Sequence, residues 1–175
     1  MKVTYYVASS LDGYIAKANG DVSLLDSLGI SMAETGYDNF FSSVDGLVMG
    51  RKTYAFVQEY GSWPYGDKPT WVCRHSEIAP FPDCNLQIAT APSDVVTAAR
   101  ALEINHLWLV GGSILSSAFI KQQLLTHISI SQMPILLGSG IRLFANLPAA
   151  VKVRNQTVQQ YASGFSQLEF ELCYA

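Results

Sequence analysis

The chain has 175 residues, of which 49% are hydrophobic and 14% charged, and its formal net charge is −3. This balance excludes intrinsic disorder, and the small acidic excess gives no global attraction to nucleic acid or to an anionic membrane. A chain of this length is expected to form one domain over residues 1–175. The low charge content also suggests an apolar surface that a partner covers, most simply a second copy of the chain.

The sequence carries no signal for a membrane span or for export. No stretch approaches about 18 consecutive apolar residues, and the N-terminal apolar run is too short for a secretory signal. Three cysteines without a CxxC pair, Cys73, Cys84 and Cys173, argue against a disulfide framework or a zinc site. We therefore expect a cytoplasmic protein without a bound metal.

Short β-rich runs alternate with amphipathic segments along the chain. The expected strands are Val3–Ala8, Gly46–Met49, Thr70–Cys73, Leu86–Ala89, His106–Val110 and His127–Gln132. The expected helices are Ser31–Phe41, Lys52–Glu59, Ser93–Leu102 and Gly112–Leu125, the third with Ser93 as its cap. Val151–Tyr161 and Phe165–Tyr174 alternate like strands and predict a C-terminal antiparallel hairpin. The fold class is therefore α/β, with a mixed, mostly parallel sheet.

A strand, a glycine and the start of a helix meet at Gly50, Arg51, Lys52 and Thr53. The unpaired amides and the partial positive charge of a helix N-terminus attract anions. Two basic side chains and a hydroxyl strengthen that attraction. The segment is either a phosphate site or a basic pair on a solvated first turn.

Two glycines, Gly111 and Gly112, join an apolar strand to the helix that begins near Ser113. Glycines at such a turn let the backbone approach a ligand closely and can direct amides towards an anion. The pattern is not the GxGxxG fingerprint, so it does not support a Rossmann site. A tight turn that binds nothing is the alternative.

Asp12 and Gly13 follow the first strand, in a loop that continues to Asn19 and Gly20. Ligands of α/β proteins bind at the carboxyl ends of parallel strands. Asp12 either bonds a substrate hydroxyl, orders the loop, or simply forms an Asp-Gly turn. The very apolar stretch Pro134–Phe144 is expected to cover a pocket or to lie in a subunit contact.

In their order and spacing, four segments resemble the dihydrofolate reductase superfold: Ser10–Ala16, Val48–Tyr54, Leu109–Leu115 and Pro134–Phe144. The chain is most similar to the C-terminal reductase domain of the bacterial riboflavin-biosynthesis deaminase-reductase, as a small stand-alone member. The resemblance implies a three-layer fold and a homodimer. It also implies an NADPH-dependent oxidoreductase that transfers a hydride to a pyrimidine or pterin type of small molecule.

The resemblance also implies roles for individual residues. Those implied to bind NADPH are Ala8, Ile15, Asn19, Gly20, Gly50, Arg51, Lys52, Thr53, Cys73, Arg74, Gly111, Gly112, Ser113, Ile114 and Leu115, with a cis peptide frequent at the Gly-Gly pair. Asp12 is the candidate catalytic residue, and Ser10, Glu34, Asp38 and Gly138 are substrate candidates. The cationic residues favour NADPH over NADH, because only NADPH carries the extra phosphate.

One departure from the family concerns the substrate. Small stand-alone members usually carry a Trp shortly after the Asn-Gly-Asp segment, whereas Ser23, Leu24 and Leu25 follow it here. The alternatives to a riboflavin-type pyrimidine are dihydrofolate or another pteridine, a carbonyl or imine compound, and a module that binds NADPH without turnover. The scattered residues His75, His106 and His127 are expected to be structural.

Overall fold

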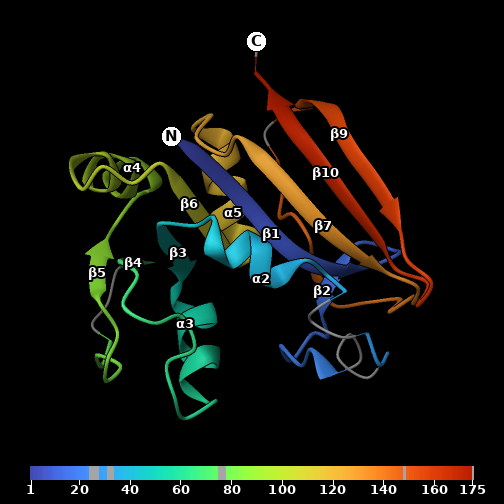
Figure 1. The fold of residues 1–175 in the computed structure, drawn as a ribbon, viewed down its shortest axis with the longest axis horizontal. Helices are drawn as coiled ribbons and strands as arrows, with labels where there is room; N and C mark the ends of the chain where they lie inside the picture. Colours follow the sequence, from blue (N-terminus) through green and yellow to red (C-terminus); the bar gives the residue numbers. More distant parts are fainter. Residues whose placement is uncertain (24–27, 31–33, 75–77, 148, 175) are drawn as a thin grey trace.

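The computed structural model describes residues 1–23, 28–30, 34–74, 78–147 and 149–174. Within these residues, an eight-stranded sheet has the strand order β5-β4-β3-β6-β1-β7-β10-β9 (Figure 1). Its strands are β1 (Lys2–Ser10), β3 (Gly46–Gly50), β4 (Thr70–Cys73), β5 (Leu86–Ala89), β6 (His106–Gly111), β7 (His127–Met133), β9 (Lys152–Gln160) and β10 (Ser166–Cys173). The first six are parallel, and β10 and β9 are antiparallel additions. The predicted mixed sheet and C-terminal hairpin are confirmed.

Helices cover both faces of this sheet, which gives the expected three layers. α4 (Pro92–Ala101) and α5 (Ser113–Lys121) pack on one face, where they share a core with the central strands. α2 (Tyr37–Ser42) and α3 (Arg51–Gln58) lie on the other face. Figure 1 shows α2 in front of the sheet and α5 behind it. None of the helices in the described part of the chain combines the length and apolar character that crossing a membrane requires.

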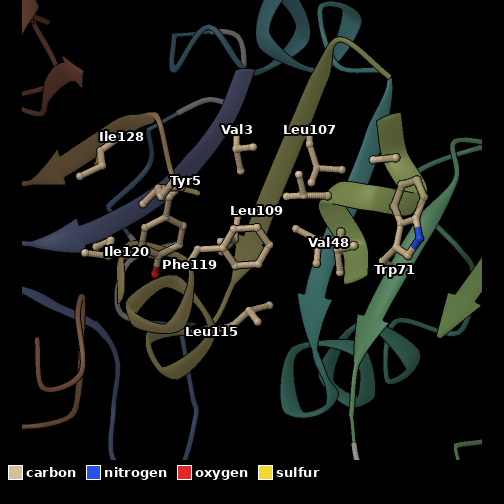
Figure 2. Close-up of a cluster of buried hydrophobic side chains, with 14 of the residues drawn as sticks. Val3, Tyr5, Val48, Trp71, Leu107, Leu109, Leu115, Phe119, Ile120 and Ile128 are labelled. Atoms are coloured by element: carbon tan, nitrogen blue, oxygen red, sulfur yellow. The ribbon is translucent and has the colours of Figure 1, made fainter. Parts of the chain in front are cut away.

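The largest buried cluster lies between the sheet and α5. Alternate residues of a strand point to opposite faces of the sheet. The face towards α5 carries Tyr5, Val48 and Leu109 (Figure 2). Phe119 of α5 packs against them and is fully buried. Burying each such side chain contributes about 1.5–3 kcal/mol, so this layer positions the start of α5 firmly against the sheet.

An aromatic cluster holds α2 on the opposite face. Phe40 stacks on Tyr6 of β1 with ring centroids 4.3 Å apart, and both rings meet Trp108 of β6 edge-on. A helix of six residues is too short to be stable alone. Aromatic packing therefore explains why α2 forms, and it fixes the ring of Tyr6 in place.

The prediction of a helix over Ser31–Phe41 is wrong at its start, because α2 begins at Tyr37. Gly36 adopts a left-handed conformation with φ of 71°, which a continuing right-handed helix cannot accommodate. Glu34, predicted to lie on the helix, is in the turn before it. Residues 31–33 lie outside the described residues.

Two other predicted helix boundaries are also wrong. α4 begins at Pro92 after the N-cap Ala91, rather than at Ser93, and the Asp94 carboxylate accepts a hydrogen bond from the Ala91 amide at 3.0 Å. Proline suits the first helical position, where its missing N–H is not needed. α5 ends at Lys121 rather than Leu125, because Gln123 adopts a φ of 56°.

Two short strands that were not predicted form a separate sheet. β2 (Tyr14–Ala16) pairs antiparallel with β8 (Ile141–Arg142), at the end of β1. The pairing joins the loop after β1 to the apolar segment Pro134–Phe144. Strands of three and two residues are too short to show a periodic pattern, so neither has a local signal in the sequence.

His106, at the start of β6, is buried and hydrogen-bonded through both ring nitrogens. Nε2 lies 2.8 Å from Thr4 Oγ1, and Nδ1 lies 3.1 Å from the Ser43 carbonyl oxygen. Burial lowers the pKa of His106 and keeps the imidazole neutral. These contacts agree with a structural role. His75, by contrast, lies outside the described residues.

We expect the stability of the protein to fall as the pH drops below about 6.5, the ordinary pKa of histidine. The unfolded chain then takes up a proton that the folded His106 resists, so acid favours unfolding. Urea unfolding at several pH values measures this, and His106→Gln should show a smaller dependence. An identical pH dependence in the variant would contradict the prediction.

Candidate functional site

Two predicted glycine turns lie side by side at the carboxyl edge of the sheet. β3 and β6 are adjacent parallel strands, with Met49 opposite Gly111. Gly50 ends β3 and caps α3, and Gly112 follows β6 and caps α5. A Cβ built on Gly50 would lie 3.8 Å from the carbonyl oxygen of Gly111. The structure thus brings together two segments that are about 60 residues apart in sequence.

Thr53 of α3 faces the Gly-Gly turn. A Cβ on Gly111 would lie 3.5 Å from Thr53 Oγ1, and one on Gly112 would lie 3.7 Å from the same oxygen. Side chains at these positions would occupy the space between the turn and the hydroxyl. The Gly111–Gly112 peptide is cis, which confirms the expectation from the resemblance. The Gly50 turn, the Gly-Gly turn and Thr53 thus lie together, and we call this arrangement the cradle.

Helices α3 and α5 both begin at this cradle. The N-cap residues Gly50 and Gly112 have no side chain that could accept a hydrogen bond from the first-turn amides, and neither helix has an acidic residue in its first turn. The first-turn amides of a helix have no partner within the helix and bind anions readily. Arg51 and Lys52 are exposed in the first turn of α3 and add two positive charges.

Arg74 borders the same cradle from β4. Cys73 is opposite Gly50 in register, so Arg74 follows directly beside the Gly50 turn. Its backbone amide donates to the Ala89 carbonyl at 3.0 Å, and its side-chain Nε is buried with no hydrogen-bond partner in the described part of the chain. An unsatisfied buried donor is costly. Arg74 and the cradle therefore fit an anionic group such as a phosphate.

Two residues predicted to bind the cofactor turn their side chains away from the cradle. Leu115 of α5 and Cys73 of β4 belong to the core between the sheet and α5. Burial raises the pKa of the Cys73 thiol to about 11, so it remains protonated. Their side chains therefore contribute to the core rather than to the cradle. Ile114, in contrast, is 75% exposed, and Ser113 is buried in the first turn.

The remaining predicted cofactor residues lie around the end of β1. Tyr5 is opposite Leu109 in the parallel pair of β1 and β6. Ala8 lies three residues further along β1, towards the carboxyl edge of the sheet at which Gly112 also lies. Ile15 is half-buried in β2, and Asn19 and Gly20 form a turn in which Asn19 Oδ1 accepts a hydrogen bond from the Asp21 amide at 3.1 Å.

Asp12, the predicted catalytic residue, bonds to the loop that follows β7. Its carboxylate accepts hydrogen bonds from Ser10 Oγ at 2.6 Å, from the Leu137 amide at 3.0 Å and from the Gly138 amide at 2.7 Å. The Ser10 hydroxyl also accepts the Tyr14 amide at 2.9 Å. Among the three roles considered for Asp12, this geometry favours the one in which it orders the loop after β1. Ser10 and Gly138 take part in the same contact.

The Asp12→Ala variant should loosen the segment after β7, because two backbone amides lose their acceptor. We expect faster hydrogen exchange at Leu137 and Gly138, with exchange in the central strands unchanged. The hydrogen bond from Ser10 lowers the pKa of Asp12. The contact therefore stabilises the fold above the ordinary aspartate pKa and is lost as the pH falls through the lowered value. Unaltered exchange at both amides would count against this role.

A hollow of about 400 Å³ adjoins this loop contact. It is lined by Asp12, Gly13, Tyr14, Arg142, Leu143 and Phe144. Tyr14 and Arg142 are opposite each other in the small β2–β8 sheet. Both were missed by sequence reasoning, because nothing local signals the pairing. The lining by Leu143 and Phe144 supports the expectation that Pro134–Phe144 covers a pocket.

The other substrate candidates lie on the α2 side of the sheet. Asp38 is exposed in the first turn of α2, and Glu34 lies in the preceding turn. A second hollow, of about 440 Å³, lies beyond α3 and is lined by residues 58, 61–63 and 81–83. It contains none of the predicted site residues. In the described residues, no cluster of three or more His, Cys, Asp or Glu side chains could hold a metal ion.

Comparison with known proteins agrees with the fold. The RibD C-terminal domain family matches residues 62–166. The uncharacterised protein YwjB of Bacillus subtilis (strain 168) is 32% identical over 162 residues, covering 91% of this chain and 92% of YwjB. A solved protein of Shewanella sp. PV-4, provisionally assigned to riboflavin biosynthesis, is 27% identical with a TM-score of 0.85, over 99% of this chain and 100% of that one.

A more distant structure extends the likeness of the fold. The deaminase/5-amino-6-(5-phosphoribosylamino)uracil reductase of Thermotoga maritima has a TM-score of 0.73 at 16% identity. The match covers 98% of this chain and 56% of that protein.

Proposed function

Since the chain belongs to the RibD C-terminal domain family of riboflavin-pathway reductases, we propose that it is an NADPH-dependent reductase that transfers a hydride to a pyrimidine-type small molecule. The observation that carries the proposal is the cradle in which the uncapped N-termini of α3 and α5 meet beside Arg74. Backbone amides and cations in one place are what a phosphate-rich cofactor requires.

Different residues of the cradle would contact different parts of the cofactor. The phosphate that distinguishes NADPH from NADH would be held by Arg51, Lys52, Thr53 and Arg74. Gly111 and Gly112 would lie against the pyrophosphate, and Ala8 would contact the nicotinamide. When bound, NADPH supplies the hydride that an electrophilic carbon of a C=N or C=O bond accepts. The protein aligns the two partners and excludes water.

Titration of the protein with NADPH and, separately, with NADH tests the cofactor half of the proposal. Three tryptophans, Trp63, Trp71 and Trp108, provide a fluorescence signal. We expect tight binding of NADPH and weak binding of NADH. Absence of binding at millimolar NADPH would overturn the proposal.

A substrate panel with bound NADPH tests the other half. Oxidation of NADPH with 5-amino-6-(5-phosphoribosylamino)uracil would support the pyrimidine class. Turnover of dihydrofolate, blocked by an antifolate, would instead indicate a pteridine reductase, and turnover of simple carbonyls or imines a broader reductase. Stoichiometric NADPH binding without oxidation by any compound would identify a binding module rather than an enzyme.

We also propose that the protein acts as a homodimer in the cytoplasm. Leu136 in the apolar segment is 68% exposed, and Val153 and Val158 on the outer strand β9 are 50% and 55% exposed. Exposed strand edges and apolar side chains favour association. The cysteines Cys73, Cys84 and Cys173 are unpaired, as in a reducing compartment. A monomer mass by light scattering at micromolar concentration would contradict the dimer.

A further inference from the structure

Polar side chains occupy one covered face of three neighbouring strands. On this face, Tyr6 of β1 is opposite Ser129 of β7, and Ala8 is opposite Ser131. Gln167 of β10 is in turn opposite Ser131. Alternate residues share a face, so the four polar side chains form a grid around Ala8. The residues of β7 that point to the other face, Ile128 and Ile130, belong to the apolar core.

Three members of the grid form a buried hydrogen-bonded chain. The Ser131 hydroxyl donates to Gln167 Oε1 at 2.6 Å, and Gln167 Nε2 donates to the Ser129 hydroxyl at 2.7 Å. Their exposed fractions are only 2–8%. Apolar residues of the same shape would serve stability about as well as a satisfied polar set. The fold alone therefore does not require polar side chains at these positions.

The Tyr6 hydroxyl lies beside this chain of hydrogen bonds. It donates to the Thr35 carbonyl at 3.0 Å, and the Ser131 side chain is near enough to influence it. Burial raises the pKa of Tyr6, so the phenol keeps its proton. The Ser131 proton goes to Gln167, so Ser131 presents an acceptor on this side. The Tyr6 proton therefore points at the Thr35 carbonyl, and the phenolic oxygen has lone pairs left for another donor.

Packing holds Tyr6 in this orientation next to Ala8. Phe40 stacks on its ring at 4.3 Å, and Trp108 Nε1 donates to its backbone carbonyl at 3.3 Å. Tyr6 is half-buried, whereas Ser131 and Gln167 are buried behind it. The negative charge of Glu169 acts on Tyr6 from β10. These surroundings of the Tyr6 hydroxyl favour a ligand group that donates hydrogen bonds.

We propose that the Tyr6 hydroxyl accepts a hydrogen bond from an N–H group of the substrate, an amino-substituted nitrogen heterocycle, and that Ser131 and Gln167 are positioning residues that set its polarity. The inference rests on the proposed function, which puts the nicotinamide at Ala8. The reacting ring must lie within van der Waals contact of that nicotinamide. Tyr6 is two residues before Ala8 on the same strand face, so it is within reach of the ring.

Binding of 5,6-diaminouracil to the NADP-loaded protein, followed by tryptophan fluorescence or calorimetry, tests the role of Tyr6. Losing one hydrogen bond should weaken binding of this probe about 3- to 10-fold in Tyr6→Phe. Tyr37→Phe is the matched control, because Tyr37 packs in the same aromatic cluster, and its binding should be unchanged. The probe 1,3-dimethyluracil, which has no N–H group, should bind weakly to all three proteins.

The positioning residues need a second pair of variants. Gln167→Leu should weaken the binding of 5,6-diaminouracil as Tyr6→Phe does. Gln159→Leu is the control, because Gln159 is exposed on β9 opposite Gln167, and this variant should bind the probe normally. Ser131→Ala should weaken binding and Ser131→Thr, which keeps the hydroxyl, should restore it. NADPH affinity should remain close to wild type in Tyr6→Phe.

The outcomes separate this inference from the proposed function. Wild-type affinity for diaminouracil in both Tyr6→Phe and Gln167→Leu, with NADPH binding intact, would overturn the inference and leave the reductase standing. Equal binding of dimethyluracil and diaminouracil, or no binding of diaminouracil at millimolar concentration, would also overturn it. Failure to bind NADPH in the separate titration would overturn the proposed function itself.

Discussion

Replacing Gly140 with alanine should lower the free energy of unfolding by several kcal/mol. Gly140 has a φ of +153°, and a Cβ there would overlap the carbonyl group of Ala16. A backbone conformation of this kind costs other residues about 1–3 kcal/mol, and overpacking costs about 1–3 kcal/mol more. Ala16 ends β2, and Gly140 precedes β8. The glycine therefore permits the close approach that builds the small β2–β8 sheet.

Gly138→Ala is the matched control for this prediction. Gly138 also has a positive φ, of +73°, but a Cβ there would meet no atom within 4 Å. Only the conformational cost applies, about 1–2 kcal/mol. Urea unfolding of the two variants measures the difference. Equal losses in both would show that the contact with Ala16 is relieved cheaply and that the approach of the two strands does not depend on Gly140.

Arg51→Ala should weaken the binding of NADPH roughly 10- to 100-fold and leave the binding of NADH nearly unchanged. A charge-assisted hydrogen bond is worth about 1.5–3 kcal/mol, and each 1.4 kcal/mol is a tenfold change in affinity. Arg51 is the first residue of α3, where its charge adds to the helix N-terminus. Fluorescence titration with each cofactor gives both affinities.

Arg100→Ala provides the control for the loss of one positive charge. Arg100 is exposed in the last turn of α4, away from the cradle. We expect its affinities for NADPH and NADH to match those of the wild type. Arg74→Ala should behave like Arg51→Ala, because its buried Nε has no protein partner in the described residues. A similar loss of NADH affinity in Arg51→Ala would instead indicate general disruption of the site.

The parallel strands and the two glycine turns could be predicted because their signals are local. Runs such as His106–Val110 are nearly all apolar, as strands buried on both faces are. A glycine between a strand and a helix marks the turn itself. The start of α2 could not be predicted in this way. Its apolar residues continue the helical spacing backwards, and only the left-handed Gly36 shows where the helix begins.

The arrangement of the cradle was predicted better than the surroundings of Asp12 and Tyr6. Gly50, Thr53 and the Gly-Gly pair each belong to a short motif, and the structure places them together. Asp12 was found, but its three hydrogen-bond donors were not, because two of them come from residues 125 and 126 positions away. Tyr6 carries no motif, and its position beside Ser131 depends on the pairing of β1 with β7.

Local chemistry thus established the α/β class, the parallel core, the C-terminal hairpin and the two glycine turns. Periodicity and turn residues report the conformation of a few neighbouring residues, and these features need nothing more. Packing decides the polarity around Tyr6, the anchoring of Asp12 and the lack of a partner for Arg74 Nε among the described residues. Each depends on which distant strands and loops become neighbours, and that follows from burial of the whole sheet between its helices rather than from any single segment.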